Sequence, residues 1–334
     1  MDWLVTGKVI VVAPLDWGLG HATRCIPLIE KLSQHNRVII GVTAVNRFLF
    51  EKKFPHLTTI TVPTYAIRYS RWLPVWLKLI LQAPRVLLAR HREYTLLKSL
   101  IKTQTVDLII SDSRFGFFHP AIKSVYISHQ LQMEAPFLKS WLNAIHKRWI
   151  DHFDEIWIPD FENDQLALAG TLSRATHLKK RVYYLGPLSA LSEQPTSERK
   201  PLEYDFLFLL SGPEPQRSIL EKKLRLAGKQ AGKRIGLVRG VGNSGWRDED
   251  GIKVVDTLTG EELRRTIQAS NTVVCRSGYS TLMDIHLLGV QNIVLIPTPG
   301  QSEQEYLAGY WHKKFGAVCV QQKDIEKSIK NWFA

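Results

Sequence analysis

Short runs of β-branched and aliphatic residues alternate with longer stretches of helical periodicity along the whole chain. In the first half, the pattern predicts a buried strand at 8–14, a helix at 23–34 and a strand at 37–43. Alternation of this kind is typical of α/β domains built on parallel sheets. Further strands of this half are predicted at 105–112, 124–129, 155–159 and 182–187.

The same alternation starts again after a segment that is poor in apolar residues. Segment 189–205 is rich in Ser, Pro and charge, which is typical of a linker. A chain of 334 residues also exceeds the roughly 250–300 at which single cores stop growing. We therefore predict two Rossmann-like α/β domains, 1–188 and 206–334, that face a cleft between them. The elements of the second domain are predicted at 206–213, 217–228, 234–240, 252–256, 261–270, 272–278 and 292–299.

The charge balance indicates an anionic partner. The chain has 44 Lys and Arg against 31 Asp and Glu, a formal net charge of +13. No nucleic-acid-binding motif is present, so we expect a phosphorylated substrate or a membrane face and no nucleic acid. No uncharged apolar stretch reaches the roughly 18–20 residues of a spanning helix. The three scattered cysteines and the short apolar run at the N-terminus favour a cytoplasmic protein, peripheral on the membrane at most.

A basic amphipathic stretch begins near Arg68 and runs to about Lys102. Trp and Leu alternate there with Arg and Lys, a pattern that suits an interfacial helix on an anionic leaflet. The alternative is an ordinary helix whose apolar side packs in the core and whose cations are solvated. Residues 141–149, with two Trp and three basic side chains, are expected to extend the patch or to pack between the two domains.

A glycine-rich turn joins the first predicted strand to the first predicted helix. Gly18 and Gly20 allow a tight turn, and the next helix presents free N–H groups and the positive end of its dipole. We predict acceptor contacts from Gly18, Gly20 and His21 at this carboxyl edge of the sheet. His21 is a candidate general base, or a ligand of an acceptor phosphate. The alternative is a capping loop whose histidine only bonds nearby backbone.

Two further strand ends fall at the same predicted edge. Asp112 closes strand 105–112, and His129 closes strand 124–129. Asp112 is predicted to orient His21 or to act as the base itself; the alternative is that it only caps the following turn. Arg114 and His129 are predicted acceptor contacts.

Two polar loops of the second half fall side by side at the edge of the second predicted sheet. In the first, 273–284, a strand leads into a turn and a helix, where Ser280 and Thr281 suit a diphosphate and Asp284 suits a ribose. In the second, 297–306, amide and carboxylate side chains suit sugar hydroxyls. The alternative for this second loop is a solvated acidic first turn of a helix. Together the two loops predict a nucleotide-sugar pocket.

At these residues the chain resembles the MurG-type glycosyltransferases, which add N-acetylglucosamine to a lipid-linked peptidoglycan precursor. The resemblance is strongest over GLGHATR (18–24) and over 273–285 with 297–306. It implies the two-domain GT-B architecture and an inverting transfer from a UDP-sugar. It also implies that the C-terminal domain binds the donor and the N-terminal domain binds the acceptor.

The resemblance also assigns donor-binding residues by position. Asp284 takes the ribose-binding place where the family has Glu, and Gln304 and Glu305 take the place of paired Gln residues. Glu305 leaves the sugar open, and Asp16-Trp17 in place of small residues implies a different acceptor. The donor-binding set is Ser211, Gly212, Arg276, Ser277, Gly278, Ser280, Thr281, Asp284, Gln301, Gln304 and Glu305, with Arg276, Ser277 and Gly278 at the diphosphate.

The sequence therefore predicts a hexosyl- or N-acetylhexosaminyltransferase with a glycan or lipid acceptor. His21 or Asp112 removes the acceptor proton, while Arg276 and helix N–H groups stabilise the departing diphosphate. We expect no metal, since no promising loop carries a DxD-like carboxylate pair, and no cofactor besides the nucleotide sugar. Two alternatives stay open: a sugar-nucleotide epimerase of the same architecture, and a non-enzymatic nucleotide-sugar-binding protein.

Overall fold

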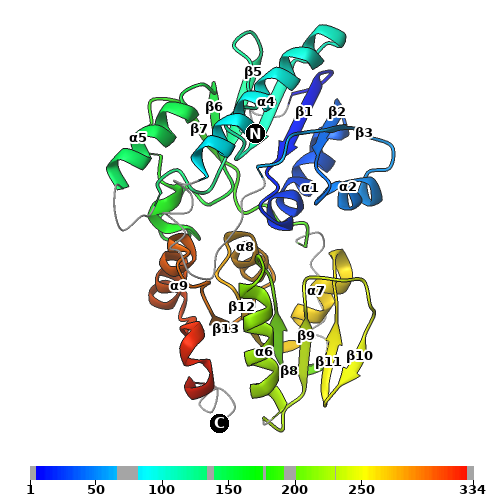
Figure 1. Ribbon diagram of the computed structural model, residues 1–334, viewed down its shortest axis with the longest axis vertical. Coiled ribbons are helices and arrows are strands. Elements are labelled where there is room, and N and C mark those ends of the chain that lie inside the picture. Colours follow the sequence, from blue (N-terminus) through cyan, green and yellow to red (C-terminus); the bar gives the residue numbers. More distant parts are fainter. Residues whose placement is uncertain are drawn as a thin grey trace. The chain divides into compact units, whose positions relative to one another are not determined.

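The computed structural model describes residues 5–65, 82–133, 139–175, 178–191, 201–229 and 231–328. They form two compact units, one up to Ala190 and one from Leu191 onward, which we call the N-terminal and C-terminal units. Each unit contains a seven-stranded sheet joined by helices (Figure 1). The predicted α/β class with two Rossmann-like domains is confirmed.

The sheet of the N-terminal unit is parallel throughout, with the strand order β3-β2-β1-β4-β5-β6-β7. Its strands are β1 (Val9–Pro14), β2 (Arg37–Val42), β3 (Thr58–Thr61), β4 (Leu108–Asp112), β5 (Lys123–Ile127), β6 (Glu155–Ile158) and β7 (Arg181–Tyr184). Its helices are α1 (Leu19–Ser33), α2 (Arg47–Lys53), α4 (Ala83–Thr103), α5 (Lys139–Ile150) and the 3₁₀ turn η1 (Gly170–Ser173).

Both faces of this sheet are covered, which explains the continuous apolar run of β1. Ile10 and Val12 pack in one cluster with Ile29 of α1. Val11 and Ala13 point the other way and pack in a second cluster with Leu97 of α4. Central strands of parallel sheets are apolar at successive positions for this reason, because helices cover each face.

The strand order of the N-terminal unit reverses between β1 and β4. The chain runs from β1 outward to β2 and β3, and then returns to the other side of β1 as β4. The register places Pro14 beside Asp112, so the carboxyl ends of β1 and β4 meet. Such reversal points are where open α/β sheets bind their ligands.

The C-terminal unit repeats this arrangement with the order β10-β11-β9-β8-β12-β13-β14, in which only β10 runs antiparallel to its neighbour. Its strands are β8 (Tyr204–Leu209), β9 (Ile235–Val238), β10 (Arg247–Glu249), β11 (Ile252–Val255), β12 (Ser270–Cys275), β13 (Asn292–Leu295) and β14 (Val318–Cys319). Its helices are α6 (Gln216–Lys229), α7 (Gly260–Gln268), α8 (Tyr279–Leu287), α9 (Ser302–Phe315) and the 3₁₀ turn η2 (Gln322–Asp324). The reversal lies between β8 and β12, where Leu209 pairs with Cys275.

Two predicted segments are only partly described. Residues 192–200 of the predicted linker 189–205 lie outside the described ranges, and Tyr204 and Asp205 belong to β8. Residues 66–81 of the predicted basic stretch also lie outside them, whereas its second part is α4.

Gly116 lies where helix α4 approaches the loop after β4 most closely. A Cβ atom at Gly116 would lie 2.1 Å from the carbonyl oxygen of Arg90 and 2.7 Å from its carbonyl carbon. Both neighbours are backbone of α4, so they cannot rotate away as a side chain would. The backbone N–H of Gly116 also donates to Glu93 Oε2 at 3.0 Å, which fixes the loop against the helix.

Gly116→Ala should therefore lower the free energy of unfolding by roughly 1–3 kcal/mol or more, because an added methyl must push α4 from the sheet. Urea denaturation followed by circular dichroism measures the effect. Gly309→Ala is the control: an added Cβ there meets nothing within 4 Å and sits inside α9. A Gly116→Ala protein as stable as the wild type would contradict this packing.

Candidate active site

The carboxyl ends of β1 and β4 bring the predicted catalytic residues together. α1 begins at Leu19 directly after Gly18, whose φ of 97° lies in the region that glycine adopts readily. This turn places His21 in the first turn of α1, with its side chain 18% exposed. His21 Nδ1 lies 3.1 Å from Asp112 Oδ2 at the end of β4. The structure thus pairs the two candidate bases.

Arg24, which the sequence analysis did not single out, lies at the centre of this cluster. Its guanidinium donates to both carboxylate oxygens of Asp112, with Nε 3.1 Å from Oδ2. It also lies 2.8 Å from His21 Nδ1 and 3.1 Å from His129 Nδ1. Arg24 follows His21 by three residues, so both side chains lie on one face of α1. The three-residue spacing of His21 and Arg24 was the feature of the sequence that could have indicated this cluster.

Ser113 turns the chain sharply at the end of β4. Its φ is 60°, a left-handed backbone conformation that is uncommon for residues other than glycine. The N–H of Ser113 donates to the carbonyl of Ile127 at 3.0 Å, and Arg24 Nη2 donates to Ser113 Oγ at 3.3 Å. The turn therefore holds Asp112 beside α1 and next to the end of β5.

The electrostatics of the cluster favour an ionised carboxylate and an uncharged imidazole. Burial alone would raise the pKa of Asp112, but the charge of Arg24 and the hydrogen bonds from His21 and Arg24 hold it well below its usual range. Burial and the nearby Arg24 charge lower the pKa of His21, while Asp112 opposes them. At neutral pH, Asp112 is an anion and His21 is neutral, the state in which an imidazole accepts a proton.

Arg114 has structural contacts inside the N-terminal unit, and its predicted acceptor contact stays a prediction. Its side chain is fully buried and donates to the carbonyl oxygens of Pro14 and Pro63 at 2.8 and 2.7 Å. It also donates to Glu93 Oε1 of α4 at 2.7 Å. These bonds fasten α4 to the ends of β1 and β4, so the guanidinium faces the protein interior.

The predicted donor loop after β12 and the turn after β8 lie at the reversal point of the C-terminal sheet. Ser211 and Gly212 follow β8, and Gly212 has a φ of 97°. Gly278 precedes α8, whose first turns carry the partly exposed Ser280, Thr281 and Asp284. Because β8 and β12 are neighbours, both loops emerge side by side.

The loop before α9 is held by the side chains that were predicted to contact the sugar. Gln304 Oε1 accepts a bond from the N–H of Thr298 at 2.9 Å, and Glu305 Oε1 accepts one from Gly300 at 3.0 Å. Gln301 precedes the first turn of α9. Ser277 Oγ donates to the carbonyl of Gln304 at 2.7 Å, which ties this loop to the turn after β12. These bonds fix the backbone of the loop before α9.

Arg276 braces the C-terminal unit, and its predicted contact with the diphosphate stays a prediction. Its side chain is buried and donates to the carbonyls of Ile296 and Pro297, both at 3.1 Å. It also donates to the carbonyl of Gln216 at 3.0 Å and to Gln322 Oε1 at 2.6 Å. Burial lowers the pKa of Arg276 to about 10, so it stays charged at neutral pH.

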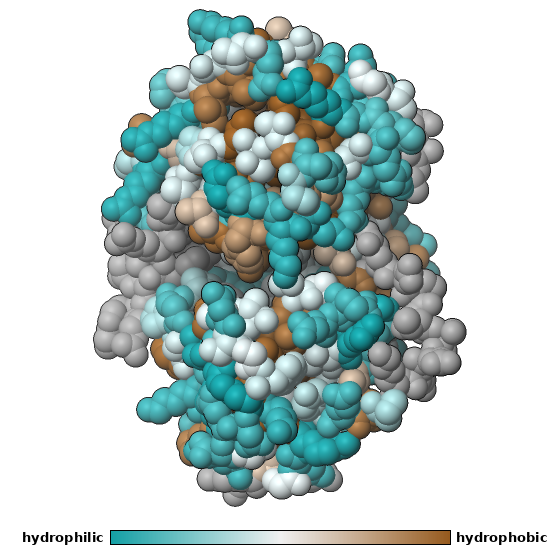
Figure 2. Space-filling model, turned by 90° about the vertical axis from the view of Figure 1, so that its right-hand side faces the viewer, coloured by the Kyte–Doolittle hydropathy of each residue, from teal (hydrophilic) through white to brown (hydrophobic). Residues whose placement is uncertain are grey.

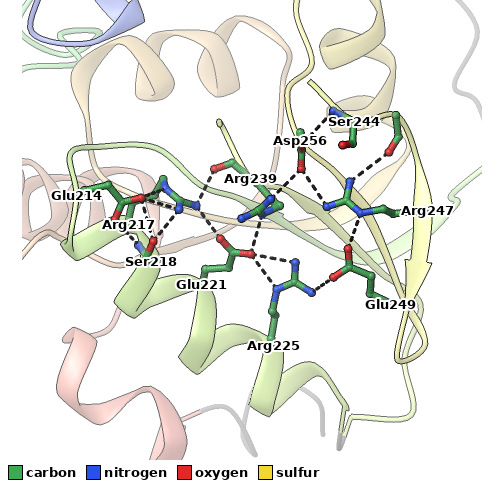
Figure 3. A network of polar contacts seen from close by, with 11 residues as sticks. Glu214, Arg217, Ser218, Glu221, Arg225, Arg239, Ser244, Arg247, Glu249 and Asp256 are labelled. Atoms are coloured by element: carbon green, nitrogen blue, oxygen red, sulfur yellow. Dashed lines mark hydrogen bonds and ion pairs between the residues drawn. The ribbon is translucent and has the colours of Figure 1, made fainter. Parts of the chain in front are cut away.

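A second arginine cluster, also missed in the sequence, shapes the loop between β9 and β10 (Figure 3). Asp256 at the end of β11 accepts bonds from Arg239 Nη1, Arg247 Nη2 and the N–H of Ser244, at 2.9, 3.0 and 2.9 Å. Glu221 of α6 accepts bonds from Arg217, Arg225 and Arg239. The network joins helix α6 to the glycine-containing loop 239–246 at the carboxyl edge of the sheet.

The carboxylates of this network are occupied by arginines, and the described residues contain no group of three His, Cys, Asp or Glu that could hold a metal ion. The arrangement therefore offers two chemical features. One is a buried acid–base cluster in the N-terminal unit. The other is a pair of helix-starting loops in the C-terminal unit, with N–H groups suited to an anion.

Comparisons with known proteins support the organisation of the chain. Residues 239–332 match the model of the glycosyltransferase family 28 C-terminal domain. No curated protein sequence matches the chain.

Three solved structures illustrate the similarity of fold. The glycotransferase of kitacinnamycin has a TM-score of 0.66 at 12% identity, over 99% of this chain and 92% of that one. Arabidopsis thaliana UGT89C1 complexed with UDP-L-rhamnose has a TM-score of 0.64 at 15% identity, over 98% and 90%. Acinetobacter baumannii MurG has a TM-score of 0.55 at 13% identity, over 98% and 89%. The predicted GT-B architecture and the distant similarity to MurG are confirmed.

The brace formed by Arg276 gives a stability prediction. Arg276→Met should lower the free energy of unfolding by about 3 kcal/mol, because buried carbonyl oxygens lose their donors. Thermal unfolding measures this loss, with Ser280→Ala on the partly exposed start of α8 as the control. An Arg276→Met protein that is as stable as the wild type but no longer binds nucleotide would instead indicate that Arg276 contacts the diphosphate, as predicted.

Proposed function

We propose that this glycosyltransferase of the GT-B architecture, which carries a family 28 C-terminal domain, transfers a sugar from a UDP-sugar to an acceptor hydroxyl with inversion. The observation that carries the proposal is the contact of 3.1 Å between His21 and the buried Asp112 at the strand reversal of the N-terminal unit. An imidazole oriented by a carboxylate is a general base suited to a hydroxyl group.

The donor assignment rests on the C-terminal unit. The family 28 match includes both loops that begin α8 and α9. A similar fold, that of Arabidopsis thaliana UGT89C1, has been solved with UDP-L-rhamnose, which supports a UDP-sugar as the donor. The N–H groups at the starts of these helices face the departing diphosphate and stabilise its charge. We propose that the transfer needs no metal, since these groups carry that role.

The chemical step follows from the state of the cluster. His21 donates its Nδ1 proton to a hydrogen bond with ionised Asp112, which leaves Nε2 as the basic atom. Nε2 takes the proton of the acceptor hydroxyl as the oxygen bonds to the anomeric carbon. The bond from that carbon to the diphosphate breaks on the opposite side, so the configuration inverts. The electron pair leaves with the diphosphate.

The acceptor is proposed to be lipid-linked and presented at a membrane surface. Leu87 and Leu88 of α4 and Trp141 of α5 are 51%, 48% and 56% exposed. Arg85 and Arg92 are exposed on the same helix as the two leucines. Apolar side chains among cations favour an anionic leaflet.

Other parts of the same stretch pack inside the N-terminal unit. Glu93 and Leu97 of α4 are buried, and His146 of α5 packs edge-on against Phe115. The core-packing interpretation therefore holds for the buried face of α4, and the membrane interpretation of its exposed face belongs to the proposal. None of the helices in the described part of the chain is long and apolar enough to cross a membrane.

Hydrophobic side chains are also exposed on another side of the N-terminal unit, among hydrophilic ones, in the upper part of Figure 2. Val45 and Phe48, which are large and exposed, come from the loop after β2 and from α2. The carboxyl end of β2 is the neighbour of the β1 end that leads to His21. An apolar acceptor group is consistent with these positions.

Incubation with a panel of UDP-sugars and lipid extracts, followed by mass spectrometry, should give a hexose- or aminosugar-bearing lipid. His21→Ala should lower the rate about 100-fold or more, since general bases contribute roughly 10²–10⁴. The same UDP-sugars incubated without acceptor separate the epimerase alternative, which would interconvert them. Sugar transfer only to water-soluble acceptors would refute the lipid acceptor alone, and transfer at full rate by His21→Ala would refute the base.

Asp284 provides a separate test of the donor site. Asp284→Ala should weaken UDP binding by about tenfold or more, as expected for loss of one hydrogen bond to a charged group. Isothermal titration calorimetry with UDP measures this affinity. Glu262→Gln, an exposed change on α7, is the matched control. Unchanged affinity of Asp284→Ala would place the ribose elsewhere.

A further inference from the structure

We propose that Arg24 is a positioning residue that keeps His21 uncharged and holds Asp112 in place beside it. The inference rests on the proposed function of His21 as the base, and it names the group that controls that base. Arg24 is buried, and its guanidinium contacts Asp112, His21, His129 and Ser113. A residue that served only to neutralise a buried carboxylate would need no contact with either histidine.

The geometry at His21 Nδ1 shows how Arg24 acts. This one ring atom lies 2.8 Å from Arg24 Nη2 and 3.1 Å from Asp112 Oδ2. A protonated imidazole carries hydrogen on both nitrogens, and a guanidinium is always a donor. Because Nδ1 already carries the hydrogen that it donates to Asp112, the added proton goes to Nε2, and the ring then places a cation 2.8 Å from the guanidinium cation. Arg24 opposes the charged form of His21, whereas Asp112 favours it.

Among the described titratable groups around His21 and Asp112, the role falls to Arg24. Asp112 comes from β4, Arg24 and Cys25 from α1, His129 from the end of β5, and Tyr126 from β5 itself. Of these five described groups, only Arg24 carries a fixed positive charge. Arg24 Nη1 lies 3.1 Å from His129 Nδ1, so the guanidinium contacts this second ring as well.

The consequence is a base that stays available at lower pH. Asp112 by itself raises the pKa of His21 and so favours the protonated ring, which cannot accept the acceptor proton. With Arg24 present, burial and the Arg24 charge lower that pKa, and the two bonds of Arg24 to Asp112 keep the carboxylate facing the ring.

Nuclear magnetic resonance of the ¹⁵N-labelled histidine rings tests the proposal without any substrate. The His21 signal is assigned by its loss in His21→Asn. In the wild type, its titration midpoint should lie below the roughly 6.5 of a free imidazole. A midpoint at or above that value would overturn the proposal, because Asp112 would then dominate. This measurement needs no substitution at Arg24.

Two substitutions separate charge from packing. In Arg24→Gln the midpoint should rise, and the ratio of kcat/KM at pH 8 to that at pH 6 should increase roughly three- to tenfold. Arg24→Lys keeps the charge, so its midpoint and its ratio should stay close to the wild type, even where the loss of the paired bonds lowers the rate.

A purely structural Arg24 would behave differently. Both variants would then lower kcat/KM by the same factor at every pH and leave the midpoint unchanged, which would overturn the proposal. If Arg24→Gln does not fold, the wild-type midpoint still tests the proposal, since a value at or above that of a free imidazole would overturn it. Failure of the proposed function is distinguishable: His21→Ala would then retain transfer, whatever the ring titration shows.

Discussion

The ion pair between Arg24 and Asp112 is the interaction on which the N-terminal site depends. Both side chains are buried, and each would be costly alone, because an unpaired charge in the interior destabilises a protein by several kcal/mol. Their hydrogen bonds connect helix α1 to strand β4, at the point where the strand order of the sheet reverses. The histidine that follows the glycine turn is held in place by the same pair. The same contacts of Arg24 and Asp112 therefore hold α1 against the sheet and position His21.

The two units share one sheet topology but carry different side chains at the carboxyl edge of the sheet. In each, neighbouring parallel strands mark a reversal of the strand order and leave two loops side by side at the carboxyl edge of the sheet. The N-terminal unit fills that edge with titratable groups, which suits proton transfer. The C-terminal unit keeps glycines and helix starts there, and uses its arginines as braces behind the loops, at Arg276 and in the network around Glu221 and Asp256 (Figure 3).

The sequence was sufficient for the fold and for part of the site. Alternating periodicities predict the two α/β domains, and strand ends that carry Asp112 and His129 predict that these side chains meet His21. The roles of the buried arginines were the part of the site that the sequence did not predict. Arg114 and Arg276 lie next to polar turns, which indicates function, yet both bond buried carbonyl oxygens contributed by segments far away in the sequence. Arg24 lies in an apolar helical stretch, and only the tertiary position of Asp112 shows why a cation is tolerated there.

The short strand β10 affects how the C-terminal sheet meets its surroundings. It has three residues, Arg247, Asp248 and Glu249, and it runs against the direction of its neighbour β11. A flat, apolar edge strand invites a second chain to extend the sheet, whereas a short and charged edge strand discourages it. The ion pairs of Arg247 thus shape the loop between β9 and β10 and also place charge on the edge strand of the sheet. This charged edge disfavours pairing with a strand of another copy of the chain.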